Sequence, residues 1–241
     1  MGSERVLFVA PHPDDVEIGC GATICAFVQA RFEVACVFLT RGERGGDPDV
    51  REKESRKACA SLGLRQGNIF FGSFPDTGIT VSHEVIAFLE RFVDERLWGV
   101  FVPSVHETHQ DHRHAGEACQ SAFRRLGRIL AYESPSVTSA FNPNVFVPIG
   151  GLVRKKWDAL RCHHSQIDQN RMYLQYRSMV QLAAFRGQQN GVEYAEAFEA
   201  VRLRIDPGLT VWKKQRGSIG SPIPVDVFPL KKGAGRAGAR K

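Results

Sequence analysis

Short apolar runs alternate with longer segments of helical periodicity over roughly the first 135 residues of the chain. The apolar runs are rich in Val, Phe and Leu, a composition typical of strands that are buried on both faces of a parallel sheet. The longer segments have the amphipathic spacing of helices. The predicted strands are residues 5–10, 33–39, 68–71, 99–103 and 129–132, and the predicted helices are residues 18–30, 49–62, 82–96 and 112–125.

Residues at two helix ends support this assignment. Gly63 follows the second predicted helix, in the position where a left-handed residue commonly ends a helix, and Ser82 stands at the N-cap of the third. Strands and helices that alternate in this way form βα units. The sequence therefore predicts an α/β fold, a Rossmann-like open, mainly parallel sheet with helices on both faces.

The pattern changes after residue 135. Residues 134–148 contain three prolines and two asparagines around a short β-like run at 145–148. Helical segments follow at residues 152–162 and 169–188, and then an extended segment near residues 197–205. We expect these elements to form a C-terminal layer that packs onto the sheet and closes the site, within one domain that spans residues 1–230.

Composition narrows the class of protein. A chain of 241 residues with 43% hydrophobic content is long enough to bury a full core in one domain. Its six cysteines form no C-x-x-C pair, which indicates buried thiols and neither disulfides nor a thiolate zinc site. The net charge is +6, but residues 231–241 carry five basic residues and no acid, so residues 1–230 carry only +1. The basicity therefore belongs to a Gly/Ala-rich tail, predicted to be disordered, and indicates no specific nucleic-acid partner.

The chain shows no targeting signal. Its apolar runs are far shorter than the ~20 residues that a membrane span needs, and no apolar segment of a signal peptide follows the first residues. The sequence thus predicts a soluble, cytoplasmic protein without a membrane partner.

Polar residues gather in the loops that follow the predicted strands. The first loop contains His12, Asp14 and Asp15, and the fourth contains four histidines within nine residues, at positions 106, 109, 112 and 114. Ligands bind to open parallel sheets at this edge, outside the carboxyl ends of the strands. His12, Asp15 and one histidine of the fourth loop would form a two-histidine, one-carboxylate site with an open coordination position, which suits Zn²⁺. Asp14 beside it could act as a base toward a bound water molecule.

Other functions fit parts of this pattern. Asp14 or Asp15 could simply cap the helix that follows, with no role in chemistry, although this alternative leaves the histidines unexplained. His12 and Asp14 with a distant histidine also match the facial triad of non-haem iron oxygenases, which usually have jelly-roll folds. A nucleotide-binding dehydrogenase or transferase would fit the fold alone. The first loop, however, carries carboxylates where a dinucleotide site requires glycines, and these would repel a pyrophosphate. A sugar-binding protein that holds a metal without hydrolysing its ligand is a further alternative.

The sequences His12-Pro13-Asp14-Asp15 and His109-Gln110-Asp111-His112 together resemble the paired signature of the LmbE-like (PIG-L) zinc-dependent N-deacetylases. These Rossmann-like enzymes remove acetyl groups from N-acetylglucosamine-type sugars. Val16 stands where many members carry glutamate, and Gln110 replaces the usual proline. Shorter pieces extend the resemblance to about residue 200; they are Thr40-Arg41-Gly42-Glu43, Arg51 with Glu54, Pro75-Asp76-Thr77-Gly78, His163-His164-Ser165-Gln166 and Tyr194-Ala195-Glu196-Ala197-Phe198.

The resemblance implies a role for each matching residue. Asp14 would be the general base, and His109 would stabilise the oxyanion or act as an acid while Asp111 keeps it charged. The metal would be Zn²⁺, with Fe²⁺ or another divalent ion as alternatives. The implied partner is a small N-acetylated amino sugar, and trimers and hexamers among relatives make a homo-oligomer an expectation of the family. The implied metal ligands are His12, Asp15 and His112, and the implied sugar-binding residues are Arg51, Asp76 and His163.

Overall fold

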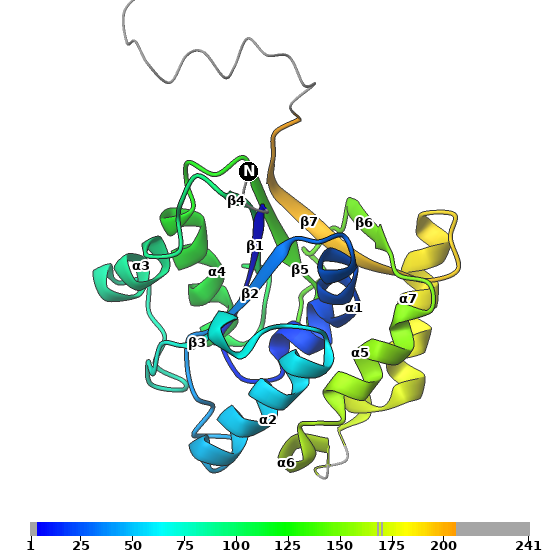
Figure 1. Cartoon of the computed structure of the whole chain (residues 1–241), viewed down its shortest axis with the longest axis horizontal. Coiled ribbons are helices and arrows are strands. Elements are labelled where there is room, and N and C mark those ends of the chain that lie inside the picture. Colours follow the sequence, from blue (N-terminus) through cyan, green and yellow to red (C-terminus); the bar gives the residue numbers. More distant parts are fainter. Residues whose placement is uncertain (1–3, 168, 170, 206–241) are drawn as a thin grey trace, which may run out of the picture. The chain divides into compact units, whose positions relative to one another are not determined.

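The computed structural model describes residues 4–167, 169 and 171–205, and its strands form one seven-stranded sheet (Figure 1). The strand order is β3-β2-β1-β4-β5-β7-β6. Strands β1 to β5 run parallel, whereas β7 is antiparallel to both β5 and β6. The predicted Rossmann-like, mainly parallel sheet is confirmed, whereas the predicted tail at 231–241 lies outside the described residues. The strands are β1 (Arg5–Ala10), β2 (Glu33–Phe38), β3 (Ile69–Phe71), β4 (Leu97–Pro103), β5 (Arg128–Tyr132), β6 (Val145–Pro148) and β7 (Ala195–Leu203).

The bounds of helices α1 and α3 differ from the predictions. Helix α1 begins at Asp15, earlier than residue 18, because acidic side chains in the first turn interact favourably with the helix dipole. Helix α3 ends at Glu90, and farther along the chain the Asp94 carboxylate accepts the Arg96 N–H at 3.0 Å in a turn, so residues 94–96 do not continue the helix as predicted. The helices are α1 (Asp15–Gln29), α2 (Pro48–Ser61), α3 (His83–Glu90), α4 (Gln110–Ala122), α5 (Leu152–Leu160), α6 (His164–Ile167) and α7 (Tyr176–Gln189).

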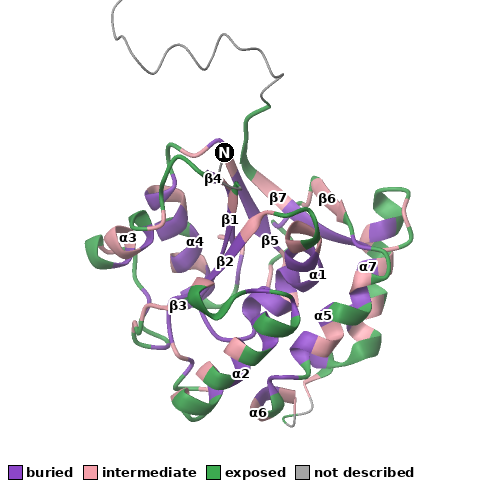
Figure 2. Cartoon of the chain, in the orientation of Figure 1, coloured by how far each residue is buried: buried purple, intermediate pink, exposed green. Residues whose placement is uncertain are grey.

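The two faces of the sheet bury separate cores. Val6, Phe8 and Ala10 of β1 contribute to the core under α1, α2 and α5, whereas Leu7 and Val9 contribute to the core under α3 and α4. All five side chains are fully buried, and Figure 2 shows buried residues along the sheet and on the inward sides of the helices. A strand buried on both faces has no polar alternation, which is why β1 reads as a continuous apolar run.

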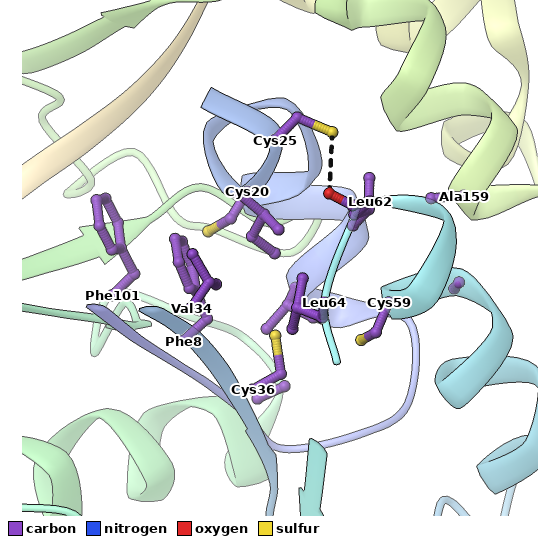
Figure 3. Packing of buried hydrophobic residues seen from close by; sticks show 14 of the residues in the cluster. Phe8, Cys20, Cys25, Val34, Cys36, Cys59, Leu62, Leu64, Phe101 and Ala159 are labelled. Carbon is purple, nitrogen blue, oxygen red and sulfur yellow. Dashed lines mark hydrogen bonds between the residues drawn. The ribbon is translucent and has the colours of Figure 1, made fainter. Parts of the chain in front are cut away.

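The six cysteines are buried and free, as their spacing indicated. Cys20, Cys36 and Cys59 lie in the core between the sheet and helices α1 and α2 (Figure 3). Burial raises the pKa of the Cys20 and Cys119 thiols, so these groups stay protonated at neutral pH. The cysteines thus pack as small apolar side chains.

The C-terminal part contributes both strands and helices. Strands β6 and β7 extend the sheet beyond β5, and the ring of Phe198 in β7 packs edge-on against Phe101 in β4, with centroids 4.9 Å apart. Helices α5 and α7 pack with α1 around a third apolar cluster, which includes Leu174 and Met179. The last helix begins at Tyr176 and not at residue 169, because Met172–Leu174 form a 3₁₀ turn (η2) that buries Leu174 in this cluster. The predicted helical layer is present, and its extended segment is a strand of the sheet itself.

Within the described part of the chain, none of the helices combines the length and the apolarity needed to cross a membrane.

Close packing fixes α1, the helix that begins in the first polar loop. A Cβ atom at Gly19 would lie 2.5 Å from a ring carbon of Tyr132 in β5. Glu196 of β7 accepts hydrogen bonds from two main-chain N–H groups of α1, at 3.1 and 2.7 Å, and pairs with Lys156 of α5 at 2.6 Å. These contacts hold α1 against the sheet and against α5.

Replacement of Gly19 by alanine is therefore expected to lower the free energy of unfolding by about 1–3 kcal/mol, the usual cost of overpacking a core. Chemical denaturation measures this change. Gly67→Ala is the matched control, because a Cβ at Gly67 meets nothing within 4 Å. Its expected effect is below about 0.5 kcal/mol. Equal losses in the two variants would show that Gly19 is not a close-packing position.

Candidate functional site

The loop between β1 and α1 brings a histidine and two aspartates to the carboxyl edge of the sheet. The main-chain N–H of His12 donates to the Asp15 carboxylate at 2.9 Å. Asp14 occupies the N-cap position of α1 with a φ of +101°, yet its side chain makes no capping hydrogen bond. Helix capping, one of the alternatives for Asp14, is therefore not its role. A non-glycine residue in this backbone region is strained, and such strain is concentrated at functional sites.

His12, Asp15 and His112 form a group of three side chains that could hold a metal ion. Oδ2 of Asp15 lies 3.3 Å from Nδ1 of His12 and 3.3 Å from Nε2 of His112. Donor atoms about 2.0–2.1 Å from a tetrahedral metal ion lie about 3.3–3.4 Å from one another. All three side chains are buried. The group therefore fits a small divalent cation and leaves one coordination position open. Of the four histidines in the fourth loop, it includes His112.

Each of the two histidines has a further carboxylate behind it. Nε2 of His12 lies 3.0 Å from Oδ2 of Asp111, and Nδ1 of His112 lies 3.5 Å from Oε1 of Glu107. Glu107 is itself held by hydroxyl groups, among them that of Ser136 at 2.6 Å. Carboxylates in this position orient ligand imidazoles and increase their basicity. This arrangement is a second reason why the donor group fits a metal ion.

Electrostatics in the site favour a cation at its centre. Burial lowers the pKa of His112, but the Asp15 carboxylate outweighs burial and raises this pKa to about 9. Burial also acts against the charged form of His12, whereas hydrogen bonds to Asp111 and Asp15 raise its pKa well above the ordinary value. Burial raises the pKa of Asp15, but His112 and His12 lower it strongly overall. The metal-free group therefore retains protons that a divalent cation would displace.

Asp14 differs electrostatically from its neighbour Asp15. Burial and the Asp15 charge raise the pKa of Asp14 to about 6, although Arg51 opposes this shift. Nη2 of Arg51 lies 3.4 Å from Oδ2 of Asp14 and donates to the Pro13 carbonyl at 2.7 Å, while Nη1 donates to the Gly42 carbonyl at 2.8 Å. Arg51, implied as a sugar-binding residue, thus braces two loops of the site. Asp14 remains available as a base of unusually high pKa.

The structure corrects one expected pairing, that of Asp111 with His109. The Asp111 carboxylate accepts the N–H groups of Thr77 at 2.8 Å and Ile79 at 3.3 Å and contacts Nε2 of His12. Nδ1 of His109 accepts the main-chain N–H of Asp111 at 3.2 Å, which caps α4. Burial and the two neighbouring histidines lower the pKa of His109. The Asp111 carboxylate therefore contacts His12, and its attraction for a charged His109 is outweighed by burial and by the two neighbouring histidines.

The two remaining predicted residues lie at different depths. Oδ1 of Asp76 lies 3.3 Å from Nε2 of His12, and Oδ2 accepts the Arg44 N–H at 3.0 Å. His163 is only 1% exposed, and its Nε2 lies 3.4 Å from Oε1 of the buried Glu17. Asp76 thus lines the site, whereas His163, in the turn between α5 and α6, is buried against Glu17 of α1.

A cavity of about 410 Å³ opens above the donor group. Arg44, Gln166 and Tyr173 contribute to its lining, and the sequence pattern did not identify them as site residues. Tyr173 fell within the predicted helix at residues 169–188, and nothing in the sequence pattern indicated that it would lie beside the site. The predicted site residues that line the cavity are His12, Asp14, Asp15, Arg51, Asp76, His109 and His112.

Comparisons with known proteins agree with this geometry. The PIG-L family model, described as GlcNAc-PI de-N-acetylase, matches residues 7–123. The uncharacterized deacetylase YaiS of Escherichia coli is 34% identical over 149 residues, or 58% of this chain and 80% of that protein. Diacetylchitobiose deacetylase of Thermococcus kodakarensis is 30% identical over 232 residues, or 86% of this chain and 84% of that protein.

A solved structure supports the same assignment. The N,N'-diacetylchitobiose deacetylase of Pyrococcus horikoshii matches the fold with a TM-score of 0.70 and 26% identity, over 87% of this chain and 89% of that chain. A relative matched over most of both chains, a shared fold and two signature loops at one cavity together establish that this chain belongs to the PIG-L (LmbE-like) family.

Proposed function

We propose that the chain is a zinc-dependent hydrolase that removes the N-acetyl group from an N-acetylglucosamine-type sugar or sugar conjugate and releases acetate and a free amine. The observation that carries the proposal is the three-residue group in which Oδ2 of Asp15 lies 3.3 Å from a nitrogen of each histidine, beside the strained, high-pKa Asp14. The names of the relatives, two of which are diacetylchitobiose deacetylases, support the choice of an acetylated amino sugar.

His12, Asp15 and His112 would hold the zinc ion. When bound, zinc supplies Lewis-acid chemistry, which polarises the acetamide carbonyl and lowers the pKa of a water molecule. Two nitrogen donors and one oxygen donor suit zinc, and three protein ligands leave the open position that catalytic sites require.

Asp14 takes the proton of the attacking water on its carboxylate and passes it to the departing amine nitrogen. A carboxyl group with a pKa of about 6 is mostly ionised at neutral pH, yet it is a stronger base than an ordinary aspartate. The N–H groups of Arg51 hold the loop that presents this carboxylate to the cavity.

His109 stabilises the oxyanion as a neutral donor. Its Nδ1 accepts the Asp111 N–H, so the neutral ring carries its proton on Nε2. A donor placed where an oxyanion develops commonly contributes about 10²- to 10³-fold to the rate. This role differs from the charged acid that the family resemblance implies.

Metal analysis and a mass-spectrometric screen of N-acetylated sugars test the proposal. We expect one zinc ion per chain, loss of the acetyl group, abolition of turnover by a chelator and recovery on addition of zinc. Bound iron with oxygen-dependent turnover would favour the oxygenase alternative. Metal and sugar binding without any release of acetate would favour a sugar-binding protein.

A further inference from the structure

A second cavity, of about 120 Å³, lies beside the first and shares lining residues with it. Ile18 of α1, Pro135 after β5 and Tyr173 of η2 line both cavities. The second cavity is lined by residues of α1, α5, α7 and β7, among others. Helices α1, α5 and α7, which are neighbours in Figure 1, also pack around the third apolar cluster. We call the second cavity the side cavity. The shared lining residues show that the side cavity adjoins the site.

The side cavity presents an apolar surface. Leu160, Met179, Leu182 and Ala183 contribute to its lining. Three of them are buried, whereas Leu182 is 43% exposed. A cavity lined by such side chains binds apolar groups in preference to water.

The charged side chains of the lining form ion pairs with one another. Arg186 binds Glu133 through two hydrogen bonds, of 2.9 and 2.5 Å. Lys156 pairs with Glu196 at 2.6 Å, and Glu196 also accepts two main-chain N–H groups of α1. A phosphate or a carboxylate would meet cations that are already paired with carboxylates, and breaking such buried pairs costs free energy. The side cavity therefore favours an uncharged, apolar occupant.

The size of the side cavity limits that occupant. An apolar cavity of about 150 Å³ accommodates a benzene molecule. We propose that the side cavity, at about 120 Å³, receives a phenyl or short alkyl group attached through the glycosidic oxygen of the acetylated sugar. The preferred substrates are then N-acetylglucosaminides of apolar alcohols, in contrast to the disaccharide named for two relatives. This inference rests on the proposed deacetylase function.

A substrate series tests the inference. The methyl and phenyl glycosides of N-acetylglucosamine, as both anomers, are compared with N,N'-diacetylchitobiose by the release of acetate. We expect kcat/KM for one anomer of the phenyl glycoside to exceed that for the methyl glycoside and the disaccharide by about tenfold or more, mainly through a lower KM. Equal values of kcat/KM for the phenyl and methyl glycosides would overturn the inference and leave the deacetylase proposal intact.

Variants of α7 connect this preference to the side cavity. Ala183→Phe fills the cavity and is expected to reduce the ratio of phenyl to methyl kcat/KM to about one, and Leu182→Ser is expected to reduce it severalfold. Leu182 is partly exposed, so its variant stays informative if the larger residue at position 183 prevents folding. Phe185→Ser is the matched control, because Phe185 lies on the same helix, is 51% exposed and is not among the lining residues. A wild-type ratio in both lining variants would overturn the inference.

A binding experiment separates the inference from the proposed function. Phenyl and methyl glucosides lack the acetamide group, so calorimetric titration with them reports only the sugar site and the side cavity. We expect the phenyl glucoside to bind about tenfold more tightly, and Ala183→Phe to remove the difference. This result would support the side cavity even if no acetylated sugar were hydrolysed, whereas equal binding of the two glucosides would contradict it.

Discussion

The Asp14→Asn variant is expected to retain its metal and to lose about 10²- to 10⁴-fold in kcat, the range that a general base contributes. Asparagine tolerates a positive φ, which residue 14 adopts at +101°, whereas alanine would add backbone strain to the chemical loss. Its side-chain oxygen also keeps an acceptor within reach of Nη2 of Arg51. The loss then reports the missing base and not a collapsed loop.

Three measurements on the same preparation check this prediction. Acetate release gives kcat, elemental analysis gives the metal content, and thermal denaturation shows whether the loop and helix remain folded. Asp49→Asn is the control for the same chemical change, because Asp49 has a side chain that is 71% exposed on the first turn of α2. We expect it to have wild-type kcat. Near-wild-type turnover in Asp14→Asn would remove Asp14 from the mechanism.

The sequence predicted the sheet well because burial on both faces leaves a direct trace in composition. Strand β1 and strand β6 have the predicted bounds, and the parallel order follows from the alternation of strand and helix. The place of β7 between β5 and β6 could not be predicted in this way. It depends on pairing between residues far apart in the chain, such as Tyr132 with Phe198, and local patterns carry no information about such pairs.

The meeting of the candidate metal-binding residues could also be predicted, because parallel strands bring their following loops to one edge. His12 and Asp15 follow β1, His112 follows β4, and these two strands are neighbours in the sheet. The pairing of side chains within the site was harder to predict from the sequence. The first turn of α4 points Asp111 toward His12, and His109 caps that helix, an arrangement set by side-chain direction and not by spacing.

The positions of residues behind the site also could not be predicted from the sequence. Glu107 stood in the histidine-rich loop without an assigned role, although its carboxylate lies 3.5 Å from His112. His163 belonged to a recognised motif, but its depth behind the first loop depends on how α5 packs against α1 and α2. Sequence motifs thus identified which residues meet, and tertiary packing decided which of them face the cavity.

The Asp15→Asn variant is expected to lose its metal and, with it, deacetylation. Asp15 is the one carboxylate in the group of His12, Asp15 and His112, and it lies 3.3 Å from a nitrogen of each histidine. Its replacement by a neutral amide therefore removes the negative charge that a cation would meet between the two histidines. Loss of a residue that only supports a ligand typically reduces metal affinity about 10- to 100-fold, and loss of the ligand itself should exceed this range.

Asp76→Asn provides the matched comparison for Asp15→Asn. Both aspartates lie 3.3 Å from a nitrogen of His12, but Asp76 contacts Nε2, the ring nitrogen that does not face Asp15, and is not a member of the group of His12, Asp15 and His112. Competition with a chromophoric chelator measures zinc affinity in both variants without reference to activity. We expect Asp76→Asn to bind zinc within about 100-fold of the wild type and Asp15→Asn to fall below that range. The reverse order would assign the carboxylate ligand to Asp76 and require a different donor set around His12.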